Sequence, residues 1–171
     1  MRKMILYTAI SLDGYIAGPQ GEIDWLYSDD DYGYYDFYET IDTLLMGRTT
    51  YDFIAQFSPY PHADRMNYVF TRTLTAAPSD HLRFVAGDPV EFARTLKAEE
   101  GKPIWLVGGG QINAILFEAG LVDEIILSIH PTILGRGIHL FTGPVSQTNF
   151  KTIQVKTFPS GLVQWHGERQ L

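Results

Sequence analysis

Cysteine is absent from the 171-residue sequence, and this absence removes several classes of function at once. Thiol catalysis, disulfide frameworks, iron–sulfur clusters and zinc sites built on thiolates all require cysteine. The histidines are five in number and show none of the paired spacings found in zinc enzymes. The sequence therefore predicts a protein without a metal site.

Positive charge and long apolar runs are also scarce. Lysine and arginine total 13 against 20 aspartates and glutamates, and they form no cluster of the kind that nucleic acid binding needs, so we expect no nucleic-acid partner. No run is long and apolar enough to span a membrane, which predicts no membrane partner. The N-terminal apolar stretch meets Ser11 and Asp13 too early for the hydrophobic region of a signal peptide. These features predict a cytoplasmic protein.

The composition is that of an ordinary folded protein, with 45% hydrophobic and 19% charged residues. We see no repeat or linker, so we expect residues 1–171 to form a single domain. Strand-like and helix-like segments alternate through the first two-thirds of the chain, and strand-like segments close it. This pattern predicts an α/β fold with a mixed, mainly parallel sheet, helices on both faces and an antiparallel C-terminal part.

The expected elements can be placed by residue number. Apolar runs predict strands at 4–10, 43–46, 68–71, 82–86, 104–107, 124–130, 152–158 and 162–168. Helical spacing and capping residues predict helices at 31–41, 49–57, 88–101 and from Gly110 to about Gly120. Residues 11–30 are expected to form a long loop, and loops of this length are usually functional.

A glycine run is the strongest local signal. Gly108-Gly109-Gly110-Gln111 follows an apolar strand and begins a helix. Glycines let a phosphate approach the backbone, and the helix N-terminus offers free N–H groups and a positive dipole end. The run therefore predicts an anion-binding loop, with a plain tight turn as the alternative. Its spacing is neither the dinucleotide fingerprint of Rossmann domains nor a P-loop.

Two other strand ends carry possible phosphate ligands. Met46-Gly47-Arg48-Thr49-Thr50 leads from a short apolar strand into a helix, and Arg48 can donate two hydrogen bonds to a phosphate. Thr71-Arg72 ends another strand. Either arginine could bind a phosphate on a nucleotide ribose, although each arginine alone would be interpreted as a solvated surface residue.

These segments, in this order, resemble dihydrofolate reductases and, more closely, the reductase domain of bifunctional riboflavin biosynthesis enzymes. The resemblance spans nearly the whole chain. It implies a dihydrofolate-reductase-like fold, NADPH as the cofactor and a homodimer. The matching segments are 10–17, 46–51, 69–72, 107–111, and 119–124 followed by 131–137.

The resemblance also implies roles for residues on the cofactor side. The pyrophosphate and the 2′-phosphate would be held by Gly47, Arg48, Thr49 and Thr50. The adenosine end would be flanked by Thr71 and Arg72. The pyrophosphate would be cradled by Gly108, Gly109, Gly110, Gln111 and Ile112, with a cis peptide bond between Gly108 and Gly109. The nicotinamide would be lined by Ala9, Ile16 and Ala17.

The substrate side matches less closely. The resemblance implies that Asp31 is a substrate-facing carboxylate, that Ser128 is hydrogen-bonded to it, and that Tyr35 is an aromatic contact. Trp25 is a further substrate-binding candidate, and its neighbour Asp24 is the alternative carboxylate. The acidic residues 28–31 are also typical of a helix cap, which leaves a structural role for Asp31 open.

The expected function is hydride transfer from NADPH to a C=N or C=O bond of a small, heterocyclic substrate, similar to a pterin or a ribosylamino-pyrimidine. A nitro compound or a quinone is another possible acceptor. The alternative is a degenerate family member that binds a nucleotide or a partner without turnover.

Overall fold

The computed structural model describes residues 1–73 and 79–170. The strands are β1 Met4–Ser11, β2 Tyr15–Ala17, β3 Thr43–Gly47, β4 Met66–Phe70, β5 Leu82–Val85, β6 Ile104–Gly108, β7 Glu124–His130, β8 Ile138–His139, β9 Phe150–Thr157 and β10 Val163–Arg169. The helices are α1 Tyr34–Thr40, α2 Arg48–Ile54, α3 Pro89–Ala98 and α4 Gly110–Glu118.

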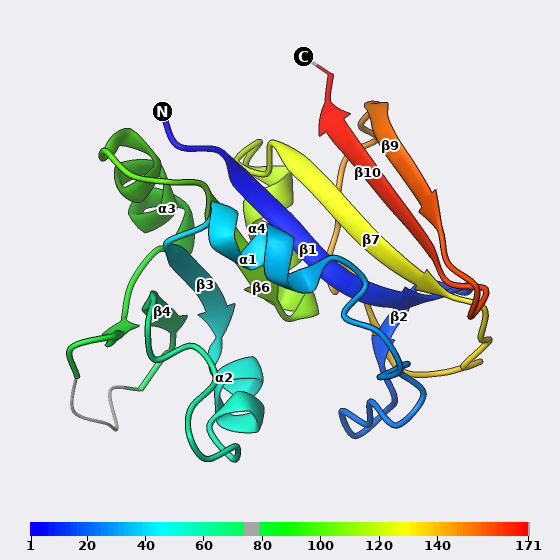
Figure 1. Ribbon diagram of the computed structural model, residues 1–171. Helices are drawn as coiled ribbons and strands as arrows, with labels where there is room; N and C mark the ends of the chain where they lie inside the picture. Colours follow the sequence, from blue (N-terminus) through cyan, green and yellow to red (C-terminus); the bar gives the residue numbers. More distant parts are fainter. Residues whose placement is uncertain (74–78, 171) are drawn as a thin grey trace.

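Eight strands form one sheet in the order β5-β4-β3-β6-β1-β7-β10-β9 (Figure 1). The pairs from β5 across to β7 are parallel, whereas β10 runs antiparallel to both β7 and β9. The order of the parallel strands brings β3 and β6, which lie far apart in the sequence, side by side at the centre. The mixed sheet with an antiparallel C-terminal part agrees with the expected fold.

Helices pack on both faces of this sheet, and the alternation of side chains along each strand explains why. On β1, Met4 and Leu6 are fully buried in a core that includes residues of α3 and α4. Ile5 and Tyr7 face the opposite way and pack with residues of α1. Both faces of the central strands are therefore apolar, as expected for parallel strands covered on two sides.

The helix boundaries follow their capping residues. Helix α3 begins as expected, with the Asp88 side chain accepting a hydrogen bond from the Val90 N–H at 2.8 Å. Helix α4 ends at a left-handed Gly120, whose N–H donates to the Phe117 carbonyl. Helix α3 ends at Ala98, before the expected Gly101, because the backbone is already extended at Glu99.

The expected loop 11–30 contains a strand that the sequence did not reveal. Strand β2 pairs antiparallel with β8 in a two-stranded sheet, and both strands are too short to show a periodic pattern. The Asp13 carboxylate helps to hold the segment in place by accepting hydrogen bonds from the N–H groups of Leu134 and Gly135. Among the described residues, no helix has the length and apolar character that a membrane crossing requires.

Candidate active site

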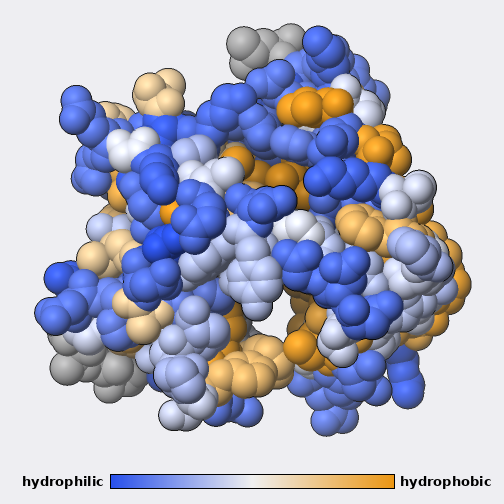
Figure 2. Space-filling model, viewed as in Figure 1, coloured by the Kyte–Doolittle hydropathy of each residue, from blue (hydrophilic) through white to orange (hydrophobic). Residues whose placement is uncertain are grey.

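The two glycine-ended strands converge at one edge of the sheet. Met46 of β3 pairs with Gly108 of β6, so the loops that follow these strands lie next to each other. A Cβ atom on Gly109 would lie 3.3 Å from Thr50 Oγ1, and one on Gly47 would lie 3.3 Å from the Ile112 side chain. Figure 2 shows that this face of the molecule is hollowed nearby, between α2 and the β2 segment.

Helix α4 points its N-terminus into this junction. Its first helical hydrogen bond runs from the Asn113 N–H to the Gly109 carbonyl at 3.0 Å. Helix geometry leaves the preceding N–H groups, those of Gly110, Gln111 and Ile112, without partners inside the helix. The Gly108–Gly109 peptide bond is cis, as the resemblance implied.

Gly110 lies where no larger residue fits. A Cβ atom there would lie 2.5 Å from the His139 carbonyl oxygen and would also overlap the Thr142 side chain. The glycines therefore let two loops and a helix N-terminus meet without side chains between them. The N–H groups at the α4 N-terminus beside these glycines suit the phosphates of a nucleotide cofactor.

The expected phosphate ligands lie on the same edge of the sheet. Arg48 begins α2; its Nε donates to Asp52 Oδ1 at 2.7 Å, and its guanidinium lies 5.7 Å from the Phe84 ring centre. Thr49 and Thr50 follow it in the first turn. Thr71 follows the neighbouring strand β4 and donates to the Thr73 carbonyl, and Arg72 beside it is exposed.

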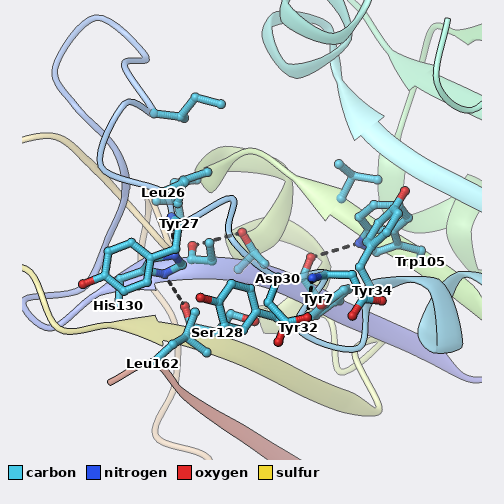
Figure 3. A pocket seen from close by; sticks show the side chains of 16 residues that line it. Tyr7, Leu26, Tyr27, Asp30, Tyr32, Tyr34, Trp105, Ser128, His130 and Leu162 are labelled. Atoms are coloured by element: carbon cyan, nitrogen blue, oxygen red, sulfur yellow. Dashed lines mark hydrogen bonds between the residues drawn. The ribbon is translucent and has the colours of Figure 1, made fainter. Parts of the chain in front are cut away.

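A cavity of about 360 Å³ lies on the α1 face of the central strands (Figure 3). Its floor consists of side chains that point the same way from β6, β1 and β7. Segments around residues 23–27 and 30–34 line it from the other side. The floor residues are Trp105 and Val107, Tyr7 and Ala9, and Ser128 and His130.

The three residues expected to line the nicotinamide lie in or next to the cavity. Ala9 and Ile16 line the cavity itself, and Ala17 is buried next to Ile16. Val107, another lining residue, directly precedes Gly108. One end of the cavity therefore lies next to the strand end that carries the 108–110 glycines.

A neutral polar group lies on the cavity floor. Gln164 of β10 donates from Nε2 to Ser128 Oγ and to the Tyr32 carbonyl, both at 3.1 Å. The Tyr7 hydroxyl interacts with the side chains of Ser128 and Gln164. Burial raises the pKa of Tyr7, and these two hydrogen-bonding partners only partly oppose it. Tyr7 is therefore a protonated donor at neutral pH.

Asp31 lines the cavity but is engaged in the backbone of α1. Its two carboxylate oxygens accept from the N–H groups of Gly33 and Tyr35 at 3.2 and 3.3 Å. Among the described residues no hydrogen bond joins Asp31 to Ser128, whose hydroxyl accepts from Gln164 instead. Both roles considered for Asp31, helix cap and cavity wall, are thus compatible with its position.

The other substrate-side candidates lie outside the cavity. Tyr35 is 69% exposed, because α1 starts only after the left-handed Gly33 and this start turns Tyr34 rather than Tyr35 inward. Trp25 packs its ring edge-on against His130 at 5.2 Å, and Asp24 beside it is exposed. The structure thus brings Asp31 and Ser128 to the cavity, but not these three.

His130 is a site residue that the sequence did not single out. Its Nδ1 lies 3.1 Å from the Ser128 carbonyl, so that nitrogen carries the proton, and its Nε2 accepts from the Tyr27 N–H at 3.2 Å. Burial lowers the pKa of His130, which keeps the ring neutral. The ring thereby anchors the 23–27 segment over the cavity. No spacing in the sequence marked this residue.

Comparison with known proteins assigns the chain to a family. The model of the RibD C-terminal domain matches residues 2–164. The chain belongs to this family. The relatives of this RibD C-terminal domain protein include the uncharacterized protein YyaP of Bacillus subtilis (strain 168), which is 38% identical over 97% of this chain and 96% of its own.

Solved structures give the same family and fold. A protein of Shewanella sp. PV-4 whose name assigns it to riboflavin biosynthesis is 30% identical, with a TM-score of 0.86 over 98% of each chain. The dihydrofolate reductase of Enterococcus faecalis, solved with NADP(H), shares the fold at a TM-score of 0.75 and 15% identity, over 99% of this chain and 97% of its own. The expected family and the dihydrofolate-reductase-like fold are confirmed, and the family is one of reductases.

Proposed function

We propose that this chain is an NADPH-dependent reductase that transfers hydride to a C=N or C=O bond of a small heterocyclic substrate. The observation that carries the proposal is the convergence of the two glycine loops at the strand ends next to the cavity. A nucleotide held by its phosphates at Gly47 and Gly108–Gly110 would extend along Ala9 and Ile16 to the cavity floor. Membership in a reductase family supports the same function.

Each part of the chain has a distinct task in this proposal. The α4 N-terminus and Arg48 bind phosphates, and the arginine favours NADPH over NADH because only NADPH carries a 2′-phosphate. When bound, the cofactor supplies the hydride. The aromatic side chains that line the cavity, among them Trp105 and Tyr34, exclude water and favour a flat substrate. The polar floor orients the bond to be reduced.

The test follows the loss of NADPH absorbance with a set of probe acceptors: dihydrofolate, 7,8-dihydrobiopterin and 9,10-phenanthrenequinone. We expect steady oxidation with at least one probe, and a slower rate with NADH. NADPH binding without turnover of any probe would instead favour the alternative, a family member that binds a nucleotide and catalyses nothing.

We also propose that the protein forms a homodimer through its antiparallel end. Strand β9 is the last strand of the sheet, and its Ile153 and Val155 are about half exposed. Figure 2 shows apolar surface on the side of the molecule where β9 and β10 lie. Light scattering at micromolar concentration should give twice the mass of one chain. A monomer would contradict this proposal, and Val155→Glu should produce one.

A further inference from the structure

We propose that the Tyr7 hydroxyl supplies the proton that accompanies hydride transfer. This inference rests on the proposed reductase function and adds the identity of the acid. Tyr7 lies near the middle of β1, two residues before Ala9, and its side chain forms part of the cavity floor (Figure 3). Tyr7 therefore lies beside Ala9, the expected nicotinamide contact, where the C=N or C=O bond to be reduced would lie.

The tyrosine ring is held in a fixed position. It packs against Phe37 and Trp105, with ring centres 4.4 and 6.1 Å away. The Trp105 indole N–H also donates to the Tyr7 carbonyl at 3.0 Å, which ties the two strands together beneath the cavity. The hydroxyl interacts with Ser128 on the neighbouring strand β7 and with Gln164 on β10, the strand beyond it. Ser128 can donate its hydroxyl hydrogen to a phenolate, because its oxygen accepts from Gln164 Nε2.

The other titratable groups of the cavity are less suited to this role. Asp31 is bound to the start of α1 through both oxygens, and Asp30 accepts from the Asp31 N–H at 2.7 Å. Both ring nitrogens of His130 have partners. The Tyr32 hydroxyl donates to Asp29 at 2.6 Å.

Tyr34 is the closest competitor because it too lines the cavity. Burial raises its pKa to about 12. Besides burial, the groups that act on its ionisation are Tyr35, Tyr7, Asp64 and Arg65, and Ser128 and Gln164 are not among them. The matched control for Tyr7 is Tyr38, a buried tyrosine that does not line the cavity and whose hydroxyl donates to Asp64.

The proposed step balances as follows. Hydride from NADPH forms a C–H bond at the carbon of the C=O or C=N group, and NADPH becomes NADP⁺. The π electron pair moves to the oxygen or nitrogen, which takes the Tyr7 proton. The phenolate then regains a proton from water at the cavity mouth. A tyrosine is fully protonated at neutral pH, whereas a carboxyl group with an ordinary pKa of about 4 is almost entirely ionised there.

The first experiment compares Tyr7→Phe with Tyr38→Phe, using 7,8-dihydrobiopterin and 9,10-phenanthrenequinone as probes. Phenylalanine keeps the ring packing, so both variants should fold. For Tyr7→Phe we expect the single-turnover rate to fall about 100-fold, in the range of general acid catalysis. The affinity for NADPH should stay within about threefold of wild type, and so should both quantities in Tyr38→Phe. A Tyr7→Phe rate within about threefold of wild type overturns the proposal and leaves the reductase function standing.

The second experiment is a pH profile of the single-turnover rate. With Tyr7 as the acid, the rate should stay level from about pH 6 to pH 9, because the donor remains protonated throughout. With a carboxyl donor such as Asp31, the rate should fall about tenfold for each pH unit. A tenfold decline for each unit overturns the proposal.

The third experiment does not depend on turnover. Tyrosines labelled with ¹³C at the hydroxyl-bearing ring carbon give an NMR signal for Tyr7, assigned by its loss in Tyr7→Phe. We expect this signal to titrate only above about pH 10 and to shift when folate is added to the NADP⁺-bound protein. If no probe acceptor is reduced, the reductase function fails, and this signal then tests only whether the Tyr7 hydroxyl is protonated and lies at the ligand site. A signal that titrates below about pH 9, or that folate at saturation leaves unchanged, overturns the proposal.

Discussion

The two halves of the candidate site are built in different ways. The nucleotide side uses backbone groups and glycines from two short, continuous segments, 46–50 and 108–112. The substrate cavity uses single side chains from positions spread over most of the sequence, from Tyr7 to Leu162. A backbone cradle needs a specific local sequence, whereas a cavity needs only that distant side chains meet.

This contrast also predicts how each half responds to change. A substitution in the glycine cradle affects donors that cannot be replaced, because a backbone N–H has one position. A substitution in the cavity removes one side chain among many. We therefore expect the largest effects on ligand affinity and stability on the nucleotide side, and smaller, separable effects on these two quantities in the cavity.

Gly110→Ala should have the largest effect. Its Cβ would meet the His139 carbonyl, so the first turn of α4 must shift and several phosphate donors shift with it. We expect the NADPH affinity to fall by at least about 100-fold, equivalent to about 3 kcal/mol. The unfolding free energy should fall by about 1–3 kcal/mol. Calorimetric titration and urea unfolding measure the two quantities.

Gly18→Ala is the matched control for this prediction. A Cβ at Gly18 would meet only the Glu22 side chain, whose carboxylate end can move aside and whose Cβ, 3.2 Å away, needs only a small shift. NADPH affinity should stay within about threefold of wild type. Equal losses of NADPH affinity in Gly110→Ala and Gly18→Ala would mean that the glycine loops do not bind the cofactor. The contrast between the two halves of the site would then fail.

Arg48→Ala should come next. If Arg48 binds the 2′-phosphate, its loss removes a charged hydrogen bond, and NADPH affinity should fall by about 1.5–3 kcal/mol, or roughly 10- to 100-fold. NADH affinity should hardly change. The exposed Arg48–Asp52 ion pair adds little to stability, so the variant should fold normally. Arg72→Ala, titrated in parallel, shows which arginine selects the cofactor; equal losses for both cofactors would count against the assignment.

His130→Gln tests the cavity side. Removing the ring that anchors Tyr27 should lower the unfolding free energy by about 1–2 kcal/mol. The pH dependence should change as well. Because burial lowers the pKa of His130, the unfolded chain binds more protons as the pH falls below the ordinary value near 6.5, so wild-type stability should decrease from there toward lower pH.

The variant should lose part of this acid sensitivity. His62, whose pKa burial also lowers, should account for the remainder. Urea unfolding at pH 7.5 and at pH 5.5 measures the difference. If the unfolding free energy of His130→Gln differs between pH 7.5 and pH 5.5 as much as that of wild type, protonation of His130 does not contribute to the acid sensitivity.

Asp31→Asn should have the smallest effect on stability. Asparagine caps helices about as well as aspartate, so the unfolding free energy should change by less than about 0.5 kcal/mol. If the carboxylate also binds the substrate, the KM for 7,8-dihydrobiopterin should rise by roughly tenfold. An unchanged KM together with a clear loss of stability in Asp31→Ala would leave Asp31 with the helix cap alone.

The sequence predicted the fold and the nucleotide side well because their signals are local. Apolar runs mark each strand of the large sheet, and Gly120 marks the end of α4 through its left-handed conformation. The glycine run at 108–110 needed only its own neighbours to be recognised. The placement of Arg48 next to that run follows from parallel pairing of β3 with β6.

The cavity could not be predicted to the same extent. In the sequence, nothing distinguishes Tyr7 and His130 from other strand residues. Their roles arise only from the packing of β1, β7 and the 23–27 segment in the folded protein. The resemblance implied an aromatic contact at Tyr35, but α1 starts at Tyr34, and Tyr34 lines the cavity instead. The β2–β8 pair is too short for any period, and the hydrogen bonds that help to hold it, from the 134–135 backbone to Asp13, join residues far apart in the sequence.

The central claim is that a nucleotide bound at the two glycine loops places its reactive carbon over Ala9 and Ile16, at the mouth of the cavity that contains Tyr7. Intermolecular NOEs from the nicotinamide C4 protons of NADPH test this directly in methyl-labelled protein. The account predicts NOEs to the methyl groups of Ala9 and Ile16. NOEs instead to Ala114 and Ile115, which line a separate groove beside α4, would contradict it.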